Sequence, residues 1–168
     1  MGIDPDPLVS GVQTLRFRIR DLAHEDLDGV MAIEKASFPF PWSRALFEEE
    51  IGRGFSDAIV AVDVPGGSVA GYAICWTVGE ESHLLNIAVR PDARNQGVGR
   101  SLLKECIRRG VRAGGRTITL EVRAGNEPAL SLYRRDWFRF TGVRRGYYTD
   151  TGEDAIVLLR EIGEDDAV

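Results

Sequence analysis

Apolar residues along this chain follow two different spacings. In some segments they alternate with polar residues, which is the period of a half-buried strand, and in others they recur every three or four residues, as on one helix face. The strands are predicted at residues 15–19, 58–62, 69–78, 84–89, 117–122, 143–148 and 155–160. The helices are predicted at residues 27–33 and 43–51, from about 98 to the glycines at 114–115, and from 126 to about 137. The predicted order is β-α-α-β-β-β-α-β-α-β-β, a mixed α/β fold.

A single domain is predicted over residues 14–162. Residues 1–13 are rich in Asp, Pro and Gly and show no periodicity, so we expect a flexible N-terminal tail there. Residues 163–168 are expected to form an acidic tail. The sequence between these ends contains no internal repeat and no linker that would divide it.

The composition is that of a soluble globular protein. The chain has 168 residues, of which 43% are hydrophobic and 28% charged. No apolar run approaches the roughly twenty residues that span a bilayer, and the first eleven residues lack the basic and apolar parts of a signal peptide. We therefore expect a cytoplasmic protein that does not bind a membrane.

Charge and cysteine usage exclude several kinds of site. The formal net charge of -5 argues against a nucleic-acid-binding surface. Cys75 and Cys106 lie in apolar periodic segments, so they are expected to be core residues in a reducing compartment, with no disulfide and no metal site. His24 and His83 lack a nearby Ser or Cys nucleophile motif, so a catalytic histidine pair is not expected.

A glycine-containing loop precedes the third predicted helix. Residues 94–101 read Arg-Asn-Gln-Gly-Val-Gly-Arg-Ser. The first N–H groups of a helix have no intrahelical partner and lie at the positive end of its dipole, so they attract anions. Gly97 and Gly99 would let a diphosphate approach the backbone, and Arg94 and Arg100 add positive charge. The alternative is a tight turn that needs glycine only for its geometry.

Two familiar nucleotide motifs do not fit this loop. A P-loop requires Lys after its last glycine, whereas Arg100 follows Gly99. The dinucleotide fingerprint requires a third glycine where Leu102 stands, within an early βαβ unit. Neither ATP nor NAD is therefore implied.

The pattern Arg-x-x-Gly-x-Gly at the start of a long helix resembles the GNAT superfamily of acyl-CoA N-acyltransferases, over about residues 15–162. More specifically, the chain is similar to RimI-type N-terminal acetyltransferases. The motifs that carry this likeness are Pro41-Trp42-Ser43, Leu85-Asn86-Ile87-Ala88-Val89, Leu120-Glu121-Val122-Arg123, Asn126, Leu132-Tyr133, Arg145-Gly146-Tyr147-Tyr148 and Gly152-Glu153-Asp154-Ala155-Ile156. The resemblance implies a central, mostly antiparallel twisted sheet of about seven strands with about four helices, splayed at the acetyl-CoA site.

The resemblance also implies acetyl-CoA as co-substrate and assigns residues to it. The residues implied for the CoA diphosphate are Arg94, Asn95, Gln96, Gly97, Val98, Gly99, Arg100 and Ser101. Ile87, Ala88 and Val89 would present backbone to the pantetheine arm, because its amides can pair with an exposed strand edge. Asn126 would hold the arm from the other side. Its alternative is a plain helix N-cap, and the two roles can coexist.

Two residues are implied for the acetyl transfer itself. Glu121 would be the general base, and its alternative is a surface carboxylate paired with Arg123 or Arg116. Tyr133, which would contact the thioester end of the cofactor, would donate its phenolic proton to the leaving sulfur. Its alternative is an aromatic residue packed in the core.

The acceptor implied by the resemblance is the N-terminal amine of a protein, with a ribosomal protein as the family's example. At pH 7 the neutral fraction of an α-amine exceeds that of a lysine by roughly a few hundredfold, which corresponds to about 3 kcal/mol. The N-terminal segment is expected to lie between Phe40 and Trp42 on one side and Tyr147 and Tyr148 on the other, although core packing is the alternative for these residues. The protein is expected to be a monomer or a weak homodimer.

The sequence is also compatible with two rival functions. One keeps acetyl-CoA but acetylates a lysine or a small amine, and the other is a non-catalytic acyl-CoA-binding module.

One departure from the family pattern also matters, because Trp137 stands where the family usually has glycine before Phe138. A side chain there restricts the backbone at the end of the last helix.

Overall fold

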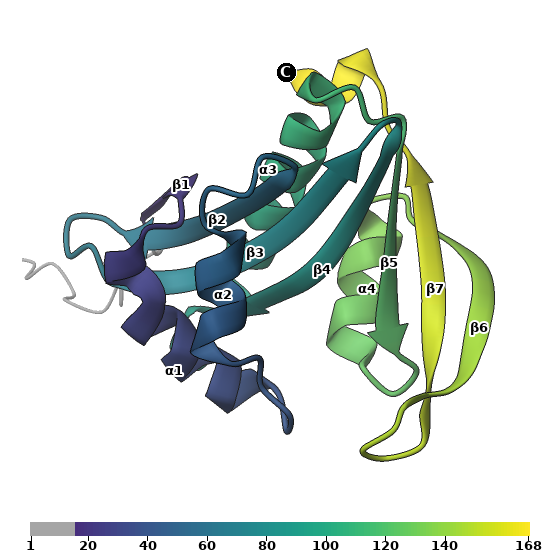
Figure 1. Cartoon of the computed structure of the whole chain (residues 1–168), viewed down its shortest axis with the longest axis horizontal. Helices are drawn as coiled ribbons and strands as arrows, with labels where there is room; N and C mark the ends of the chain where they lie inside the picture. Colours follow the sequence, from purple (N-terminus) through teal and green to yellow (C-terminus); the bar gives the residue numbers. More distant parts are fainter. Residues whose placement is uncertain (1–15) are drawn as a thin grey trace, which may run out of the picture.

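The structure, a computed structural model, describes residues 16–168 (Figure 1). The tail expected at residues 1–13 and the start of the first predicted strand lie outside the described residues. The strands are β1 (Phe17–Asp21), β2 (Ser56–Asp63), β3 (Val69–Val78), β4 (Glu81–Val89), β5 (Thr117–Arg123), β6 (Arg139–Tyr148) and β7 (Glu153–Glu161). The helices are α1 (Leu27–Ser37), α2 (Arg44–Glu50), α3 (Val98–Arg112) and α4 (Glu127–Arg135), with short 3-10 helices η1 (His24–Asp26), η2 (Pro91–Ala93) and η3 (Glu164–Ala167). The predicted order of strands and helices is confirmed.

The strands form one sheet in the order β1-β2-β3-β4-β5-β7-β6. All neighbouring strands are antiparallel except β4 and β5, which are parallel and joined through α3. A parallel pair needs such a crossover because its strands run in the same direction. The expected seven-stranded, mostly antiparallel sheet is therefore confirmed.

The sheet opens between β4 and β5. These strands pair only over Glu81–His83 and Thr117–Thr119, and from Leu84 to Val89 strand β4 pairs with β3 alone. A register shift between Ile74 and Cys75 of β3 coincides with the point of divergence. Figure 1 shows β4 and β5 moving apart toward the lower end of the view. The expected splay of the sheet is confirmed.

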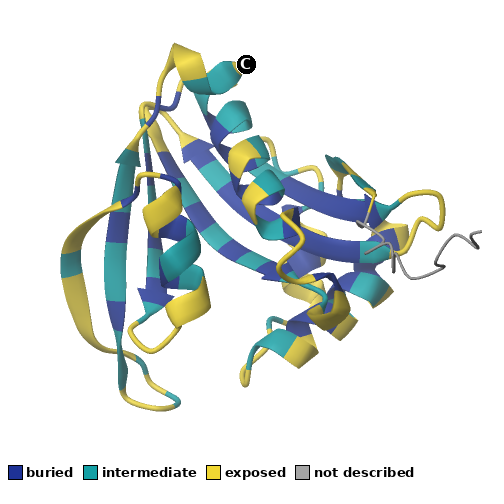
Figure 2. Cartoon of the chain, turned by 180° about the vertical axis from the view of Figure 1, so that it is seen from behind, coloured by how far each residue is buried: buried dark blue, intermediate teal, exposed yellow. Residues whose placement is uncertain are grey.

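Helices cover both faces of the β1–β4 half, but only one face of the other half. Helices α1 and α2 pack on one face, and α3 and α4 lie on the opposite face (Figures 1 and 2). Each face has its own apolar core, and the free thiols Cys75 and Cys106 are buried in the α3 core as expected. Within the described chain, the face of β5 and β7 opposite α4 carries no helix.

Several element boundaries differ from the prediction. Strand β4 begins at Glu81 and β6 at Arg139, earlier than the apolar pattern indicated. Both extensions are polar or exposed, and they are strands because neighbouring strands pair with their backbone. Helix α4 ends at Arg135, and Trp137 follows with a left-handed φ of 66°.

The residues expected to form an acidic tail include a short helix. Helix η3 packs against α3, and its Asp166 accepts a hydrogen bond from Arg160 of β7. Between residues 16 and 168, no helix is long and apolar enough to cross a membrane.

Candidate active site

The glycine loop caps the N-terminus of α3. Gly97 is the N-cap residue with φ 85°, and Asn95 before it also has a positive φ of 59°. A Cβ atom at Gly97 would meet no heavy atom within 4 Å, so glycine is needed there for its backbone angle and not for lack of space. A Cβ at Gly99 would lie 3.4 Å from Val89, in ordinary contact. The loop therefore leaves open space in front of Gly97, at the positive end of a helix of 15 residues.

Both arginines of this loop have partners within the chain. Arg94 donates from Nε to the carbonyl of Val89 at 3.0 Å and from Nη2 to Ser37 Oγ at 3.2 Å. Arg100 donates from Nε to both carboxylate oxygens of Asp136, at 3.2 and 3.3 Å. The sequence suggested neither partner. Arg94 therefore ties the end of β4 to α1, and Arg100 ties the first turn of α3 to the end of α4.

Among residues 16–168, no strand pairs with the edge of β4 that leads to this loop. Ile87, Ala88 and Val89 face Ala73, Tyr72 and Gly71 of β3, and β5 has diverged from their other side. Gln96 of the loop donates to the carbonyl of Asp92 at 3.0 Å. Asn126 accepts a hydrogen bond from the N–H of Ala129 at 3.3 Å, so it is the N-cap of α4, which was one of the two roles predicted for it. The backbone of this edge could therefore pair with an extended ligand.

Glu121 lies on the diverging part of β5, two residues beyond Thr119, the last residue paired with β4. Leu120 and Val122 point into the α3 and α4 core, so Glu121 points to the helix-free face. Its side chain is 13% exposed. One oxygen lies 2.6 Å from Nε2 of His83, and the other lies 3.5 Å from Nη2 of Arg144.

The alternative partners suggested for Glu121 are therefore wrong. Arg123 pairs with Asp150 at 2.7 Å and Arg116 pairs with Glu80 at 3.0 Å. The side chains of Arg123 and Glu121 lie on the same side of β5. The Arg123 guanidinium, however, extends to the β6–β7 turn and pairs there with the carboxylate of Asp150.

Tyr133 is buried in α4, with 4% of its surface exposed. Its ring packs at 5.5 Å from that of Phe138, as the core alternative predicted. Burial raises the pKa of Tyr133 above its usual range, so its phenol stays protonated at neutral pH. The hydroxyl makes no hydrogen bond with residues 16–168. A phenol hydroxyl without a partner in the described chain has its proton available to a bound group.

Tyr148 interacts electrostatically with both candidate catalytic residues. Burial raises the pKa of Tyr148, the guanidinium of Arg123 partly offsets this, and the charge of Glu121 adds to the rise. Tyr148 in turn contributes to the raised pKa of Tyr133. The Arg123 guanidinium stacks over the Tyr148 ring at 4.0 Å. The end of β6 is thereby brought to the opening of the sheet.

The four residues expected around the acceptor fall into two pairs. Trp42 packs at 5.4 Å from Phe47 and is half-buried, while Phe40 is 68% exposed. Tyr147 is exposed and meets Tyr148 edge-on at 5.2 Å. The α1–α2 connection that carries the first pair and the β6 end that carries the second lie on either side of the divergence of β4 from β5 (Figure 1).

Three functional candidates escaped the sequence reading. His83 contacts Glu121, Asp136 contacts Arg100, and Glu34 binds the backbone of Trp42 at 2.8 Å. Each contact joins residues at least eight positions apart, so local spacing contained no signal for it. Only the polar character of Glu34 on the otherwise apolar face of α1 hinted at a buried role.

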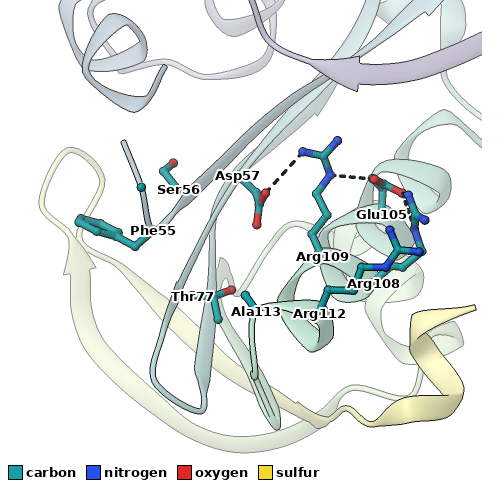
Figure 3. Close-up of a pocket in the computed structure, with 10 residues that line it drawn as sticks. Phe55, Ser56, Asp57, Thr77, Glu105, Arg108, Arg109, Arg112 and Ala113 are labelled. Carbon is teal, nitrogen blue, oxygen red and sulfur yellow. Dashed lines mark hydrogen bonds and ion pairs between the residues drawn. The ribbon is translucent and has the colours of Figure 1, made fainter. Parts of the chain in front are cut away.

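Helix α3 lines two cavities. One of about 450 Å³ lies between the C-terminal half of α3 and strands β2 and β3 (Figure 3). Its Arg109 is held by Glu105 at 2.7 Å and by Asp57 at 3.4 Å. The other, of about 490 Å³, borders Arg100 and Ser101 of the glycine loop. The first cavity contains none of the predicted site residues, whereas the second adjoins the predicted diphosphate site.

Comparison with known proteins agrees with this geometry. The acetyltransferase (GNAT) family matches residues 27–137. The [ribosomal protein bS18]-alanine N-acetyltransferase of Escherichia coli is 38% identical over 146 residues, which cover 86% of this chain and 97% of that protein. The N-alpha-acetyltransferase RimI of Mycobacterium tuberculosis is 35% identical over 128 residues, covering 74% of this chain and 78% of that protein.

A solved structure is similar over almost its full length. The crystal structure of the ribosomal-protein-S18-alanine N-acetyltransferase from Escherichia coli has a TM-score of 0.78 and 37% sequence identity, over 88% of this chain and 95% of that one. The family match, the sequence relatives and this fold agree with the glycine-capped helix beside an open strand edge. The chain therefore belongs to the GNAT family and is an acetyl-CoA-dependent N-acetyltransferase.

Proposed function

We propose that this enzyme acetylates the N-terminal α-amine of a protein, and that the protein is a ribosomal one. The observation that carries the proposal is the unpaired edge of β4, which runs directly into the glycine-capped N-terminus of α3 and faces Glu121 across the opening of the sheet. The names of the two bacterial relatives supply the acceptor class, since both are N-terminal or alanine N-acetyltransferases. Acetyl-CoA and newly made ribosomal proteins meet in the cytoplasm, where the enzyme would act.

Acetyl-CoA would bind along this edge. The backbone of Ile87 to Val89 would pair with the pantetheine arm, and the loop from Arg94 to Ser101 would hold the diphosphate. The fit rests on the open space in front of Gly97, where even a Cβ atom would meet nothing within 4 Å. Asn126 would approach the arm from α4 while its side chain caps that helix.

The reaction needs two proton transfers by side chains of this chain. The neutral amine attacks the thioester carbonyl carbon, an amide bond forms, and the carbon–sulfur bond breaks. Glu121 would take the proton that the amine loses, and Tyr133 would give its phenolic proton to the leaving sulfur. Solvent then removes the proton from Glu121 and restores one to Tyr133, so that the products are an acetylated amine and free CoA.

The acceptor would enter from the helix-free side of the sheet. Phe40 and Trp42 on one side and Tyr147 and Tyr148 on the other would bracket the first residues of the peptide. Aromatic side chains provide apolar contact area with little loss of side-chain entropy. Because an α-amine loses its proton more readily than a lysine by about 3 kcal/mol at pH 7, a single carboxylate is an adequate base.

Mass spectrometry tests cofactor, reaction and acceptor together. The enzyme and acetyl-CoA are incubated with a peptide that has a free N-terminal alanine and an internal lysine, and with the same peptide blocked at its N-terminus. We expect an acetyl group on the α-nitrogen of the first peptide and none on the second. Acetylation of the lysine in both peptides would contradict the proposed acceptor. Calorimetric binding of acetyl-CoA without transfer to any amine would instead support a binding module.

A further inference from the structure

The carboxylate of Glu121 and the imidazole of His83 form a close polar contact at the opening of the sheet. His83 Nε2 lies 2.6 Å from Glu121 Oε2. His83 is the last residue of β4 that pairs with β5, opposite Thr119. Its side chain is 40% exposed, whereas that of Glu121 is 13% exposed. The imidazole therefore connects a largely buried carboxylate with solvent.

We propose that His83 is a positioning residue that fixes the Glu121 carboxylate through its Nε2–H group and lowers its basicity when the imidazole becomes protonated. This inference rests on the proposed role of Glu121 as general base. In the neutral imidazole one ring nitrogen carries a proton, and a contact of 2.6 Å to a carboxylate requires that proton to lie on Nε2. The ring then holds one carboxylate oxygen in place.

Protonation of the ring changes what the carboxylate can do. A neutral donor leaves the negative charge of Glu121 available to the amine proton. An imidazolium at the same distance places a full positive charge on that oxygen, and a carboxylate beside a cation accepts a proton less readily. Free imidazole changes its charge between about pH 5 and 8, so a series of measurements across this range tests the effect.

The other charged groups around this pair do not change charge in that range. Arg144 of β6 lies 3.5 Å from the second carboxylate oxygen and is cationic throughout. Burial raises the pKa of Tyr148 on the same strand, so its phenol stays neutral. Trp76 of β3, directly opposite His83, is not titratable and donates its indole N–H to Glu50 of α2 at 2.7 Å. On its own strand, Glu81 lies two residues away and is exposed.

The pH dependence of kcat/KM tests this role. In the wild type, activity then increases with the loss of two protons, one from the acceptor amine and one from His83. The logarithm of kcat/KM should therefore rise with a slope approaching about two at low pH. In His83→Gln, an amide donor replaces the ring and cannot be protonated. We expect its slope to approach about one, so that the loss from pH 8 to 5.5 is about tenfold smaller than in the wild type.

The chain offers a matched control, because His24 is its only other histidine. His24 is exposed in η1, so His24→Gln should keep the wild-type slope. A His83→Gln enzyme with the wild-type slope would overturn the inference. A folded His83→Gln and a folded His83→Asn that are both inactive at every pH would also overturn it, because the ring itself would then be the base.

A second measurement does not depend on turnover. Nitrogen NMR of the imidazole at pH 8, assigned with His24→Gln, should show the proton on Nε2 of His83, and protonation of Nδ1 alone would exclude the donor role.

Failure of the proposed function is distinguishable from failure of this inference. If Glu121→Gln keeps full activity, the base assignment itself is wrong. If Glu121→Gln is inactive and the slope of His83→Gln is unchanged, only the role of His83 is wrong.

Discussion

Trp42 donates its backbone N–H to the buried carboxylate of Glu34 at 2.8 Å. The other oxygen of Glu34 accepts hydrogen bonds from the Tyr72 hydroxyl and, at 3.1 Å, from Asn86 Nδ2. One carboxylate, 1% exposed, thus joins α1, β3, β4 and the α1–α2 connection. Because Trp42 belongs to the proposed acceptor site, this network fixes that site relative to the strand proposed to bind CoA.

Replacement of Glu34 by Ala should destabilise the protein by about 3 kcal/mol. The substitution removes the acceptor of three donors, two of them buried, and an unsatisfied buried group costs free energy. Urea unfolding followed by circular dichroism measures the change. Lys35→Ala, on the exposed side of the same helix, is the control and should change stability by less than about 0.5 kcal/mol. Equal effects of the two changes would show that the network contributes little.

Replacement of Tyr133 by Phe should lower kcat by about 10²-fold or more while leaving acetyl-CoA affinity almost unchanged. The ring packing against Phe138 survives this change, and only the phenolic proton is lost. Because burial raises the pKa of Tyr133 above its usual range, activity should show no loss from its ionisation up to about pH 9. Steady-state kinetics and calorimetry measure the two effects. A full kcat in the variant would exclude Tyr133 as the acid.

The two glycines of the glycine loop should differ in their response to replacement by alanine. At Gly97 the φ of 85° strains any side chain, so Gly97→Ala should cost about 1–2 kcal/mol and weaken acetyl-CoA binding. Gly99 lies inside α3 with ordinary clearance for a Cβ, and alanine favours a helix, so Gly99→Ala should be tolerated in stability. Thermal unfolding of both variants, with and without acetyl-CoA, makes the comparison. Equal destabilisation would contradict this account of the loop.

Trp137 is strained in the position where the family pattern has glycine. Its φ is 66° and its side chain is 81% exposed, so little packing opposes its removal. Trp137→Gly should therefore be more stable than Trp137→Ala by about 1 kcal/mol, because only glycine adopts that backbone without cost. Melting temperatures of the two variants test this. Equal melting temperatures would mean that the helix end relaxes.

Acid unfolding should depend on Asp26. Burial opposes ionisation of this carboxyl, but hydrogen bonds from Arg20 and from the backbone of Ala23 hold the pKa of Asp26 below its usual value. A lowered pKa gives stability that is present above the unfolded-state value, near pH 4, and is lost as pH falls through the folded-state value. Asp26→Asn should therefore weaken the dependence of stability on pH below about 4. Urea unfolding of the wild type and of Asp26→Asn at several pH values measures the two curves of stability against pH, which should converge in this range.

The sequence by itself determined features that depend on neighbouring residues. Alternation and helical spacing gave the element order, and the glycines at 97 and 99 marked the start of α3. Asn126 was readable as a helix cap because its partner, the N–H of Ala129, is three residues away. These signals are local, because backbone geometry and periodic burial act over a few residues.

Only the tertiary structure decided which distant side chains meet. The register of β4 against β5 brings His83 to Glu121, and the insertion of β7 between β5 and β6 sets the distance from Arg144. Periodicity tells which face of a strand a residue takes, but not its neighbour across the sheet. The polar starts of β4 and β6 escaped prediction for the same reason, since pairing by other strands, and not their own composition, makes them strands.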